Sequence, residues 1–532
     1  MKKNMIIVSV VILLGLGTLG YVGMRPHWPI STNIPSGIEA KAAEIVNLKN
    51  GDTFDLTASI VKKNIAGHEV KMLAYNGSIP GPIIKVAQGA EVTINFKNEM
   101  DIPTTLHSHG VRLENKYDGV PLLTQKEVKP GESFMYKIKF PDEGVYWYHP
   151  HIREDYAQEL GLYGNYIVAS NDPQYWSPVN EELPLMVDDI LIENGKVAPF
   201  GPVADHALMG RFGNVMLVNG SDHYSLSVKE GEVVRFYITN VANTRVFNLM
   251  IPGATMKLVG ADNGRYAHEK FVDSVLLGSS ERAVVDVLFD TPGTYTIEHK
   301  TPEKIYAMGN VTVTKDTVAG SYRSQFLILR TNTDITKEIP NLDYYFNKKD
   351  DKNLSLTVDL GSMEMSNGQM MNNGAGHMME DGTMMGAGDM MTGGNDNEKI
   401  EWEDGMAAMN QMADANVIKW KIVDQDTGKS NMDIDWKFTL GDKVKIKIYN
   451  DPKSPHPMQH PIHFHGQRFL ILSTNGVRNN NLVWKDTTLV QKGDTVEILV
   501  DMENPGTWMA HCHIAEHLES GMMLQFTVKE KR

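Results

Sequence analysis

Four short segments of the chain contain histidines that are separated by a single residue. They read LHSHG at 106–110, YHPHI at 148–152, HPIHFHG at 460–466 and AHCHI at 510–514. On an extended strand, residues i and i+2 point to the same side, so each pair directs two imidazoles at one place. Because imidazole is the commonest metal ligand among side chains, these segments together predict a site for several metal ions.

The last of these segments holds the only cysteine of the 532-residue chain, Cys512. A single cysteine cannot form an internal disulfide, so its thiol is free, pairs with another molecule or binds a metal. On a strand, Cys512 points away from His511 and His513. Two His, one Cys and a weak axial Met form the ligand set of a blue electron-transfer copper, whereas they are a poor set for zinc. The residues available on the thiol side are His460, His517 and Met522.

Two sequence patterns recur three times and predict the fold. In the first, a turn glycine precedes alternating apolar residues and an Asn, at Gly89, Gly231 and Gly441. In the second, a glycine opens an extended apolar segment, at Gly144, Gly293 and Gly506. Strands entered from tight turns at regular intervals predict three homologous β-sandwich domains. The paired histidines fall in the first and third repeats, while the second retains only His299 at the corresponding place.

A methionine-rich segment interrupts the third repeat at about 361–415. It holds 13 methionines between Met363 and Met412, among many Gly, Asn and Asp residues. Thioethers are soft ligands that select Cu(I), so the segment predicts contact with substrate copper, although a low-complexity linker is the alternative. The stretch EDGMAAMNQMADAN at 403–416 predicts a short helix. Its candidate substrate-copper ligands are Met406, Met409, Met412 and Asp414, with Asp404 as a further carboxylate, and the competing interpretation is a helix face packed on the domain.

The chain begins with Lys2 and Lys3 ahead of an uncharged, mostly apolar run from Met5 to Met24. Residues 1–30 are therefore predicted to be a signal peptide or an N-terminal membrane anchor, which puts the rest of the chain outside the cytoplasm. The formal charge of −15 argues against a nucleic-acid partner.

The four histidine motifs, in this order, resemble those of the multicopper oxidase family, which includes laccases, ascorbate oxidases and bacterial cuprous oxidases. The resemblance covers nearly the whole chain after the leader and extends to the run marked by Gln158, Gly161 and Gly164. It implies an all-β fold of three consecutive cupredoxin-like Greek-key β-sandwich domains. These domains would span 40–175, 180–317 and 320–532, the last enlarged by the Met-rich insertion.

The resemblance also implies four copper ions and their ligands. His460, Cys512, His517 and Met522 would hold the type 1 copper. His107 and His463 would hold the type 2 copper, and the type 3 pair would be held by His109, His149, His151, His465, His511 and His513. This trinuclear cluster would lie between domains one and three, with domain two as a spacer that holds no copper ligand.

The implied reaction is one-electron oxidation of a substrate at the type 1 copper and four-electron reduction of O2 to water at the cluster. Electrons would pass through the backbone of Cys512 to His511 and His513. Asp118 matches the acidic residue that the family places near the cluster for proton delivery. Leu518 stands where many bacterial relatives have Glu, so the second proton donor of those relatives is missing at this position.

The Met-rich segment favours a Cu(I) oxidase of copper tolerance. The family resemblance implies that the protein works as a monomer on O2 and a small reducing substrate. Alternatives are a laccase acting on phenols or aryl amines and an Fe(II) or Mn(II) oxidase. From another class, a non-enzymatic copper store or envelope scaffold remains open. A scaffold would be expected to have lost ligands, yet all twelve copper ligands are present in the sequence.

Overall fold

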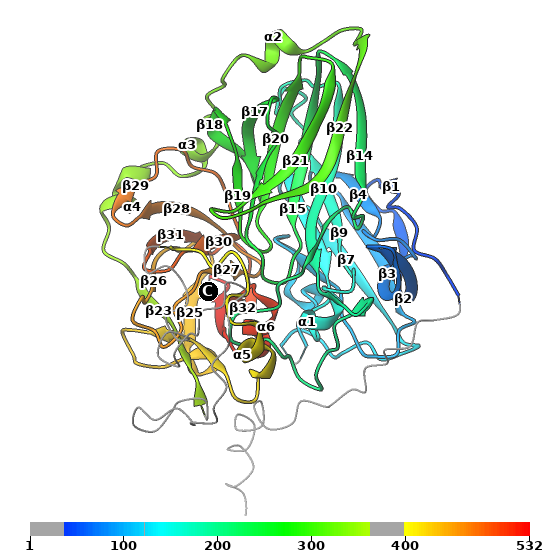
Figure 1. The fold of residues 1–532 in the computed structure, drawn as a ribbon. Helices are drawn as coiled ribbons and strands as arrows, with labels where there is room; N and C mark the ends of the chain where they lie inside the picture. Colours follow the sequence, from blue (N-terminus) through cyan, green and yellow to red (C-terminus); the bar gives the residue numbers. More distant parts are fainter. Residues whose placement is uncertain (1–36, 122, 362–397, 532) are drawn as a thin grey trace, which may run out of the picture.

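The computed structural model of the protein describes residues 37–121, 123–361 and 398–531 (Figure 1). Within these ranges the chain folds into three two-sheet β-sandwiches that follow one another along the sequence, which confirms the predicted fold class. The predicted leader lies outside the described residues, as do residues 362–397, which include ten of the methionines of the predicted insertion. Over the described ranges, every helix is too short or too polar to cross a bilayer.

The first sandwich is built from residues 45–169. One of its sheets has the order β3 (His68–Tyr75), β2 (Thr53–Ile65), β5 (Glu91–Asn98) and β7 (Ser133–Lys139). The other has the order β1 (Ile45–Asn47), β4 (Ile83–Ala87), β9 (Gly164–Ala169), β8 (Gly144–His149) and β6 (His107–His109). The facing sides carry buried apolar residues at alternate positions, as a two-layer sandwich requires.

The middle sandwich pairs a six-stranded and a five-stranded sheet between residues 181 and 317. One has the order β13 (Val215–Val218), β10 (Glu181–Ile190), β15 (Glu232–Asn240), β20 (Arg282–Phe289), β17 (Thr255–Ala261) and β18 (Gly264–Val272). The other has the order β14 (Tyr224–Glu230), β22 (Ile305–Thr317), β21 (Gly293–Lys300), β16 (Phe247–Met250) and β19 (Val275–Leu277). A small ribbon of β11 (Ile192–Glu193) and β12 (Lys196–Val197) lies beside them.

The third sandwich occupies residues 352–529. Its first sheet runs β24 (Lys419–Asp424), β23 (Lys352–Asp359), β26 (Lys443–Asn450), β31 (Thr495–Asp501), β28 (Arg468–Thr474) and β29 (Val477–Arg478). Its second runs β25 (Asp435–Thr439), β33 (Met523–Lys529), β32 (Gly506–Cys512), β27 (His460–Phe464) and β30 (Thr487–Val490).

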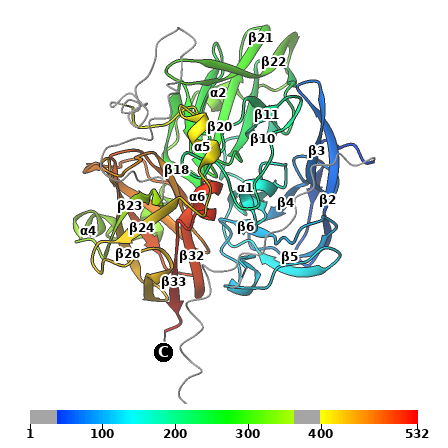
Figure 2. The ribbon, with the colours of Figure 1, turned by 60° about the horizontal axis from the view of Figure 1, so that its bottom comes forward.

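The helices are short and connect or flank the sheets. They are α1 (Glu154–Ala157), α2 (Arg323–Phe326), α3 (Asp334–Glu338), α4 (Leu342–Asn347), α5 (Ala407–Met412) and α6 (Ala515–Glu519), with 3-10 turns η1 (Asn115–Tyr117) and η5 (Asn431–Asp433). Helix α5 confirms the helix expected in the EDGMAAMNQMADAN stretch. Figure 2 shows α1 of the first sandwich beside α6 of the third, and these two helices pack against each other.

The predicted repeats correspond to equivalent strands. The strands β8, β21 and β32 each begin at the repeated glycine, Gly144, Gly293 or Gly506. All three glycines have φ between 139° and 152°, a backbone conformation that L side chains rarely adopt.

The first and third sandwiches share one continuous buried apolar core, whereas the middle one has a core of its own. The strands that carry the histidine pairs therefore meet where the first and third sandwiches join.

Candidate metal centres

Strand register brings the histidine pairs together. In the first sandwich, His107 on β6 lies opposite His149 on β8. In the third, His463 on β27 lies opposite His511 on β32. The remaining members are His109 on β6 and three residues just beyond strand ends, which are His151, His465 and His513. Strand alternation therefore explains why His107 and His109 point to the same place. His151, His465 and His513 reach the cluster from positions just past the ends of their strands.

The eight histidines form one buried cluster at the junction of the two sandwiches. Their ligand atoms fall into three groups, in each of which the atoms lie within 4.8 Å of one another. The groups are His107, His109 and His463; His109, His149 and His513; and His151, His465 and His511. Each group combines residues of the first and third sandwiches, so neither sandwich alone could build the site.

The hydrogen bonding of these imidazoles fits metal coordination. Nδ1 of His149 lies 2.8 Å from the carbonyl oxygen of Pro150, and Nδ1 of His463 lies 2.9 Å from the carbonyl oxygen of Asp486. Among the described residues, the opposite nitrogen of each ring has no hydrogen-bond partner, and the same holds for one nitrogen of His107, His109 and His151 and for both of His513. Buried polar atoms are rarely left unpaired, and a metal-binding imidazole usually uses its second nitrogen for an outer partner. The cluster therefore has the donor pattern of a metal site.

Burial keeps these rings in the form that binds metal. It lowers the pKa of His149, His151 and His511 well below the ordinary value, and neighbouring imidazoles lower it further. A neutral ring has a free lone pair for a metal ion, whereas a protonated ring has none.

A second centre lies around Cys512. Its Sγ is 3.6 Å from Nδ1 of His460 and 3.8 Å from Nδ1 of His517, and those two nitrogens are 3.3 Å apart. All three side chains are buried. Met522 is also buried. Its backbone carbonyl oxygen accepts a hydrogen bond from the backbone N–H of Cys512 at 3.1 Å. Burial raises the pKa of the Cys512 thiol, so a metal ion must displace a proton to bind there.

One short piece of strand joins the two centres. His511, next to Cys512, has Nε2 3.0 Å from Nε2 of His465 in the eight-histidine cluster. The thiol of Cys512 faces the other way, toward His460. The three-residue stretch 511–513 thus contributes candidate ligands to a mixed His–Cys group on one side and to a His-only cluster on the other.

Comparison with known proteins agrees with this arrangement. Three multicopper oxidase family models match the chain, at residues 58–173, 147–320 and 402–532. The chain belongs to the multicopper oxidase family. It is therefore an oxidoreductase, and the four copper ions of this family fit the buried His and Cys groups described above.

Several relatives of this multicopper oxidase match over most of their length. Copper resistance protein A of Escherichia coli is 23% identical, and the match covers 97% of this chain and 98% of the relative. A multicopper oxidase of Staphylococcus haemolyticus is 26% identical over 86% of this chain and 83% of its own. A solved multicopper oxidase from Campylobacter jejuni, described as a metallo-oxidase, has the same fold with a TM-score of 0.66, at 24% identity over 95% and 99% of the two chains.

The acidic residue expected near the cluster, Asp118, lies beside it. Its Oδ2 is 3.0 Å from Nδ1 of His465, and its carbonyl oxygen is 2.6 Å from Nδ1 of His107. Burial by itself would raise the pKa of Asp118, but the imidazoles of His465 and His107 outweigh burial and hold the pKa well below its usual range. Asp118 is thus placed to orient two candidate ligands, His465 through its carboxylate and His107 through its backbone carbonyl.

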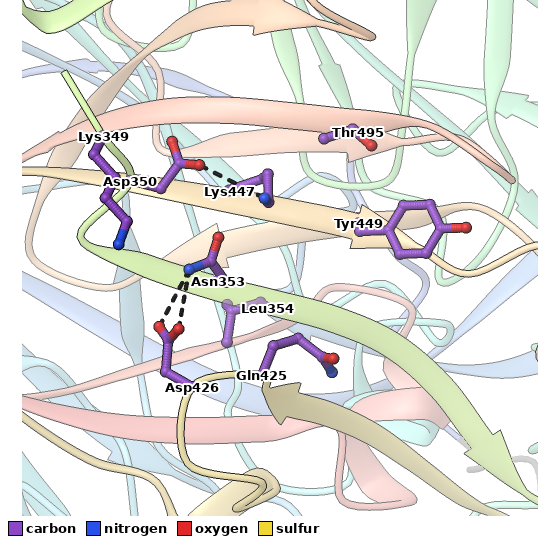
Figure 3. Close-up of a pocket in the computed structure, with 9 residues that line it drawn as sticks. All are labelled: Lys349, Asp350, Asn353, Leu354, Gln425, Asp426, Lys447, Tyr449 and Thr495. Atoms are coloured by element: carbon purple, nitrogen blue, oxygen red, sulfur yellow. Dashed lines mark hydrogen bonds and ion pairs between the residues drawn. The ribbon is translucent and has the colours of Figure 1, made fainter. Parts of the chain in front are cut away.

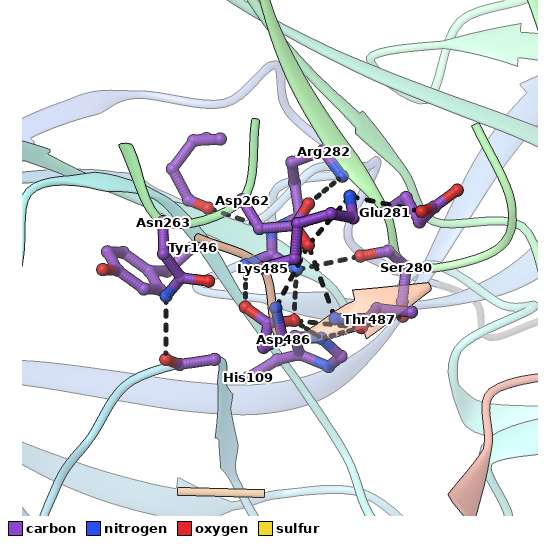
Figure 4. Close-up of polar contacts among 12 residues, drawn as sticks. His109, Tyr146, Asp262, Asn263, Ser280, Glu281, Arg282, Lys485, Asp486 and Thr487 are labelled. Atoms are coloured by element: carbon purple, nitrogen blue, oxygen red, sulfur yellow. Dashed lines mark hydrogen bonds and ion pairs between the residues drawn. The ribbon is translucent and has the colours of Figure 1, made fainter. Parts of the chain in front are cut away.

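Two polar residues at the cluster were not found from the sequence. Asp486, in the turn before β30, has Oδ1 2.9 Å from Nε2 of His109. Arg282, at the start of β20 in the middle sandwich, donates from Nη1 to the same oxygen at 2.7 Å (Figure 4). The middle sandwich was expected to hold no copper ligand and to set the distance between the other two, and this contact adds one of its side chains beside the cluster. No spacing in the sequence signals it, because the partners are 204 residues apart.

The glutamates near the cluster differ in position. Leu518, which stands where many bacterial relatives have Glu, packs in an apolar cluster with Val120, Met509 and Met523. Glu516 faces the middle sandwich, where the Thr244 hydroxyl donates to it at 3.1 Å, so it does not replace the missing Glu. Glu154, which no motif in the sequence marks as a site residue, is buried with one oxygen 3.2 Å from Nδ1 of His151.

The four candidate substrate-copper residues have unequal surroundings. Met406 and Met409 are partly buried and pack against the shared core, whereas Met412 is 74% exposed. Asp414 accepts hydrogen bonds from the backbone N–H of Asn416 at 2.8 Å and of Val417 at 3.2 Å, which stabilises the turn after α5. Met406 and Met409 therefore share contact with the core, which exposed Met412 lacks.

A surface hollow on the third sandwich is separate from both centres. Within it, the Asn353 amide donates to Asp426, and Lys447 pairs with Asp350 at 3.6 Å (Figure 3). Its lining contains no histidine, cysteine or methionine. It therefore adds nothing to the candidate metal chemistry.

Proposed function

We propose that this multicopper oxidase oxidises Cu(I), with His460, Cys512, His517 and Met522 as the type 1 ligands. In the same proposal His107 and His463 bind the type 2 copper, and the other six cluster histidines bind the type 3 pair. The observation that carries the assignment is the position of Cys512 between His511 and His513, with its thiol 3.6 Å from His460 while His511 reaches His465. When bound, copper supplies the one-electron oxidation of substrate and the reduction of O2 to water.

The protein's own residues prepare both centres. Cys512 and its two neighbours provide a short covalent path from one centre to the other. Asp118 and Asp486 hold imidazole nitrogens from outside, which fixes the tautomer and orientation of the rings. Burial excludes water from the thiol and the histidines, because every candidate His and Cys ligand is 8% exposed or less.

The preference for Cu(I) rests on how α5 is attached to the thiol centre. The carbonyl oxygen of Ala413, just after α5, accepts the N–H of Ala207 at 2.8 Å. The carbonyl oxygen of Ala207 accepts the indole N–H of Trp420, also at 2.8 Å. The Trp420 ring in turn stacks on His517, with 4.2 Å between ring centroids. Helix α5 and the residue before it, which carry the partly buried thioethers of Met409 and Met406, are thus linked through two hydrogen bonds and one stack to a candidate type 1 ligand.

Oxygen uptake tests this substrate. The copper-loaded protein would be given Cu(I) from a weak chelator or, separately, a simple phenol without added Cu(II). The test variant is Met406→Leu/Met409→Leu, which removes both thioethers with little change in volume. The matched control is Met412→Leu, because Met412 is exposed on the same helix. We expect fast Cu(I) turnover that falls in the double variant and is unchanged in the control.

Other outcomes would select the alternatives. Fast phenol turnover that does not depend on Met406 and Met409, with slow Cu(I) turnover, would make the protein a laccase. Faster turnover with Fe(II) or Mn(II) than with Cu(I) would indicate another metal oxidase. Copper bound without oxygen uptake would indicate a copper store.

We further propose that the protein works as a monomer outside the cytoplasm, with residues 1–30 as a leader or membrane anchor. The support is the pair Lys2 and Lys3 ahead of the apolar run to Met24. Proposed domain limits are 40–175, 180–317 and 320–532, and the support for them is that the strands of the three sandwiches fall at 45–169, 181–317 and 352–529. Cell fractionation of the full chain, followed by N-terminal sequencing, would separate an anchored form from a cleaved one.

A further inference from the structure

Arg282 lies where the three sandwiches meet. Its side chain is fully buried, and its Nε donates to the carbonyl oxygen of Val145 on β8 of the first sandwich at 2.9 Å. Its Nη1 donates to Oδ1 of Asp486 in the third sandwich at 2.7 Å, and its Nη2 donates to Oδ2 of the same carboxylate. One guanidinium from the middle sandwich therefore joins the two halves that build the histidine cluster.

Asp486 passes this contact on to two candidate copper ligands. Its Oδ1 lies 2.9 Å from Nε2 of His109, and its carbonyl oxygen lies 2.9 Å from Nδ1 of His463. These bonds leave Nδ1 of His109 and Nε2 of His463 without a partner among the described residues, and both atoms are buried. The two rings stack with centroids 3.7 Å apart. Asp486 therefore engages one nitrogen of each ring and leaves the other available to a metal ion, and the Thr487 hydroxyl lies 3.1 Å and 3.2 Å from the same two engaged nitrogens.

The surrounding residues hold the Arg282–Asp486 pair in one position (Figure 4). The backbone N–H of Arg282 donates to Asp262 at 2.8 Å, and Lys485 pairs with Asp262 at 3.2 Å. On the opposite side, a Cβ added to Gly110 would come within 2.8 Å of Nη2 of Arg282 and would overlap Oδ2 of Asp486. Gly110, which follows His109 in the LHSHG motif, therefore leaves space for the Arg282–Asp486 ion pair. A side chain at this position would collide with both partners of the pair.

We propose that Arg282 is a positioning residue of the trinuclear copper site. It fixes the Asp486 carboxylate, which fixes the ring of His109, while the turn that carries Asp486 fixes the ring of His463. The middle domain, which supplies no copper ligand, thereby controls copper coordination between the other two. This inference rests on the proposed copper ligands. Failure of the Arg282 role and failure of the ligand assignment would give different experimental results.

The test compares three variants of the full chain. Arg282→Gln removes the paired charge, and Arg282→Lys keeps a cation that cannot bind the carboxylate at two points. The matched control is Arg235→Gln, since Arg235 is equally buried in the middle sandwich and bonds Asp286 at 2.8 and 2.9 Å. That control removes a buried Arg–Asp pair that contacts no candidate ligand.

Each protein would be loaded with copper and characterised by copper content, electron paramagnetic resonance of type 2 copper and near-ultraviolet absorption of the type 3 pair. The blue type 1 band is an internal reference, and calorimetry of the metal-free proteins measures stability. We expect Arg282→Gln to keep the blue band and to hold cluster copper about 10- to 100-fold more weakly against a chelator, as for other outer partners of metal ligands. Arg282→Lys should lie between this variant and wild type, and Arg235→Gln should lose stability but bind copper as wild type does.

If Arg282→Gln has the spectra and copper retention of wild type, the inference is overturned. It is also overturned if Arg235→Gln loses as much copper as Arg282→Gln, because that would indicate general destabilisation. If Arg282→Gln does not fold, wild-type type 2 and type 3 signals in Arg282→Lys overturn it, and altered signals support it. Wild-type protein that binds no type 2 or type 3 copper would instead refute the proposed ligands.

Discussion

Cys512 and His511 are adjacent on β32 but serve different centres. The Sγ of Cys512 lies 3.6 Å from Nδ1 of His460, while Nε2 of His511 lies 3.0 Å from Nε2 of His465. Neighbouring side chains on a strand point to opposite faces, so this division follows from the strand itself. Two adjacent residues therefore connect the two candidate metal centres.

Replacing the thiol should separate the two centres functionally. In Cys512→Ser we expect loss of the blue absorption and of oxidase activity, because a hydroxyl cannot replace the thiolate ligand of a type 1 copper. Copper in the eight-histidine cluster should remain, since no histidine has changed. Absorption spectra and copper content per chain measure both effects. Full activity in this variant would contradict the type 1 assignment.

The axial ligand should set the potential of the type 1 copper. Met522 is buried and its backbone is bonded to Cys512, so Met522→Leu keeps the packing and removes only the thioether donor. Loss of a weak donor to Cu(II) should raise the reduction potential and leave the protein blue. A redox titration followed at the blue band measures the shift. Exposed Met412→Leu is the control, and an unchanged potential in Met522→Leu would rule out Met522 as the axial ligand.

Asp118 should matter for the reaction with oxygen more than for oxidation of substrate. In Asp118→Asn we expect re-oxidation of the reduced enzyme by O2 to slow by about 10- to 100-fold, because His465 loses a charged outer partner. Reduction of the type 1 copper by substrate should be unchanged. Stopped-flow measurements of the two half-reactions distinguish them. Asp424→Asn, a buried change in the third sandwich outside the metal groups, should leave both rates at wild-type values. Equal slowing in both variants would argue against a specific role.

His299 should make the metal-free protein sensitive to acid. Burial, and then the nearby Arg245 guanidinium, lower its pKa to about 3 from an ordinary value of 6.5. Because the unfolded chain takes up the proton first, the stability from neutral His299 is complete above pH 6.5 and is lost as the pH falls toward 3. At pH 4.5 the loss is about 2–3 kcal/mol relative to pH 7.

His299→Gln tests this pH dependence, because it can keep an acceptor for the N–H of Asn248, which donates to His299 at 3.1 Å. Denaturant unfolding at pH 7 and pH 4.5 should show a smaller fall in the free energy of unfolding for this variant than for wild type. His223→Gln is the control, since the His223 side chain is 85% exposed. The same fall in wild type and His299→Gln would contradict the assignment.

The sequence by itself determined the local pattern of this multicopper oxidase. Alternation along a strand places His107 with His109, and Cys512 opposite His511, whatever the rest of the chain does. The repeated glycines likewise predicted where β8, β21 and β32 begin. The tertiary structure alone decided which nitrogen of each ring is free and which carboxylates hold the rings. Asp486 meets His109 across 377 residues and Arg282 across 204. Such contacts depend on how separate sandwiches pack, and packing between distant segments leaves no periodic signal in the sequence.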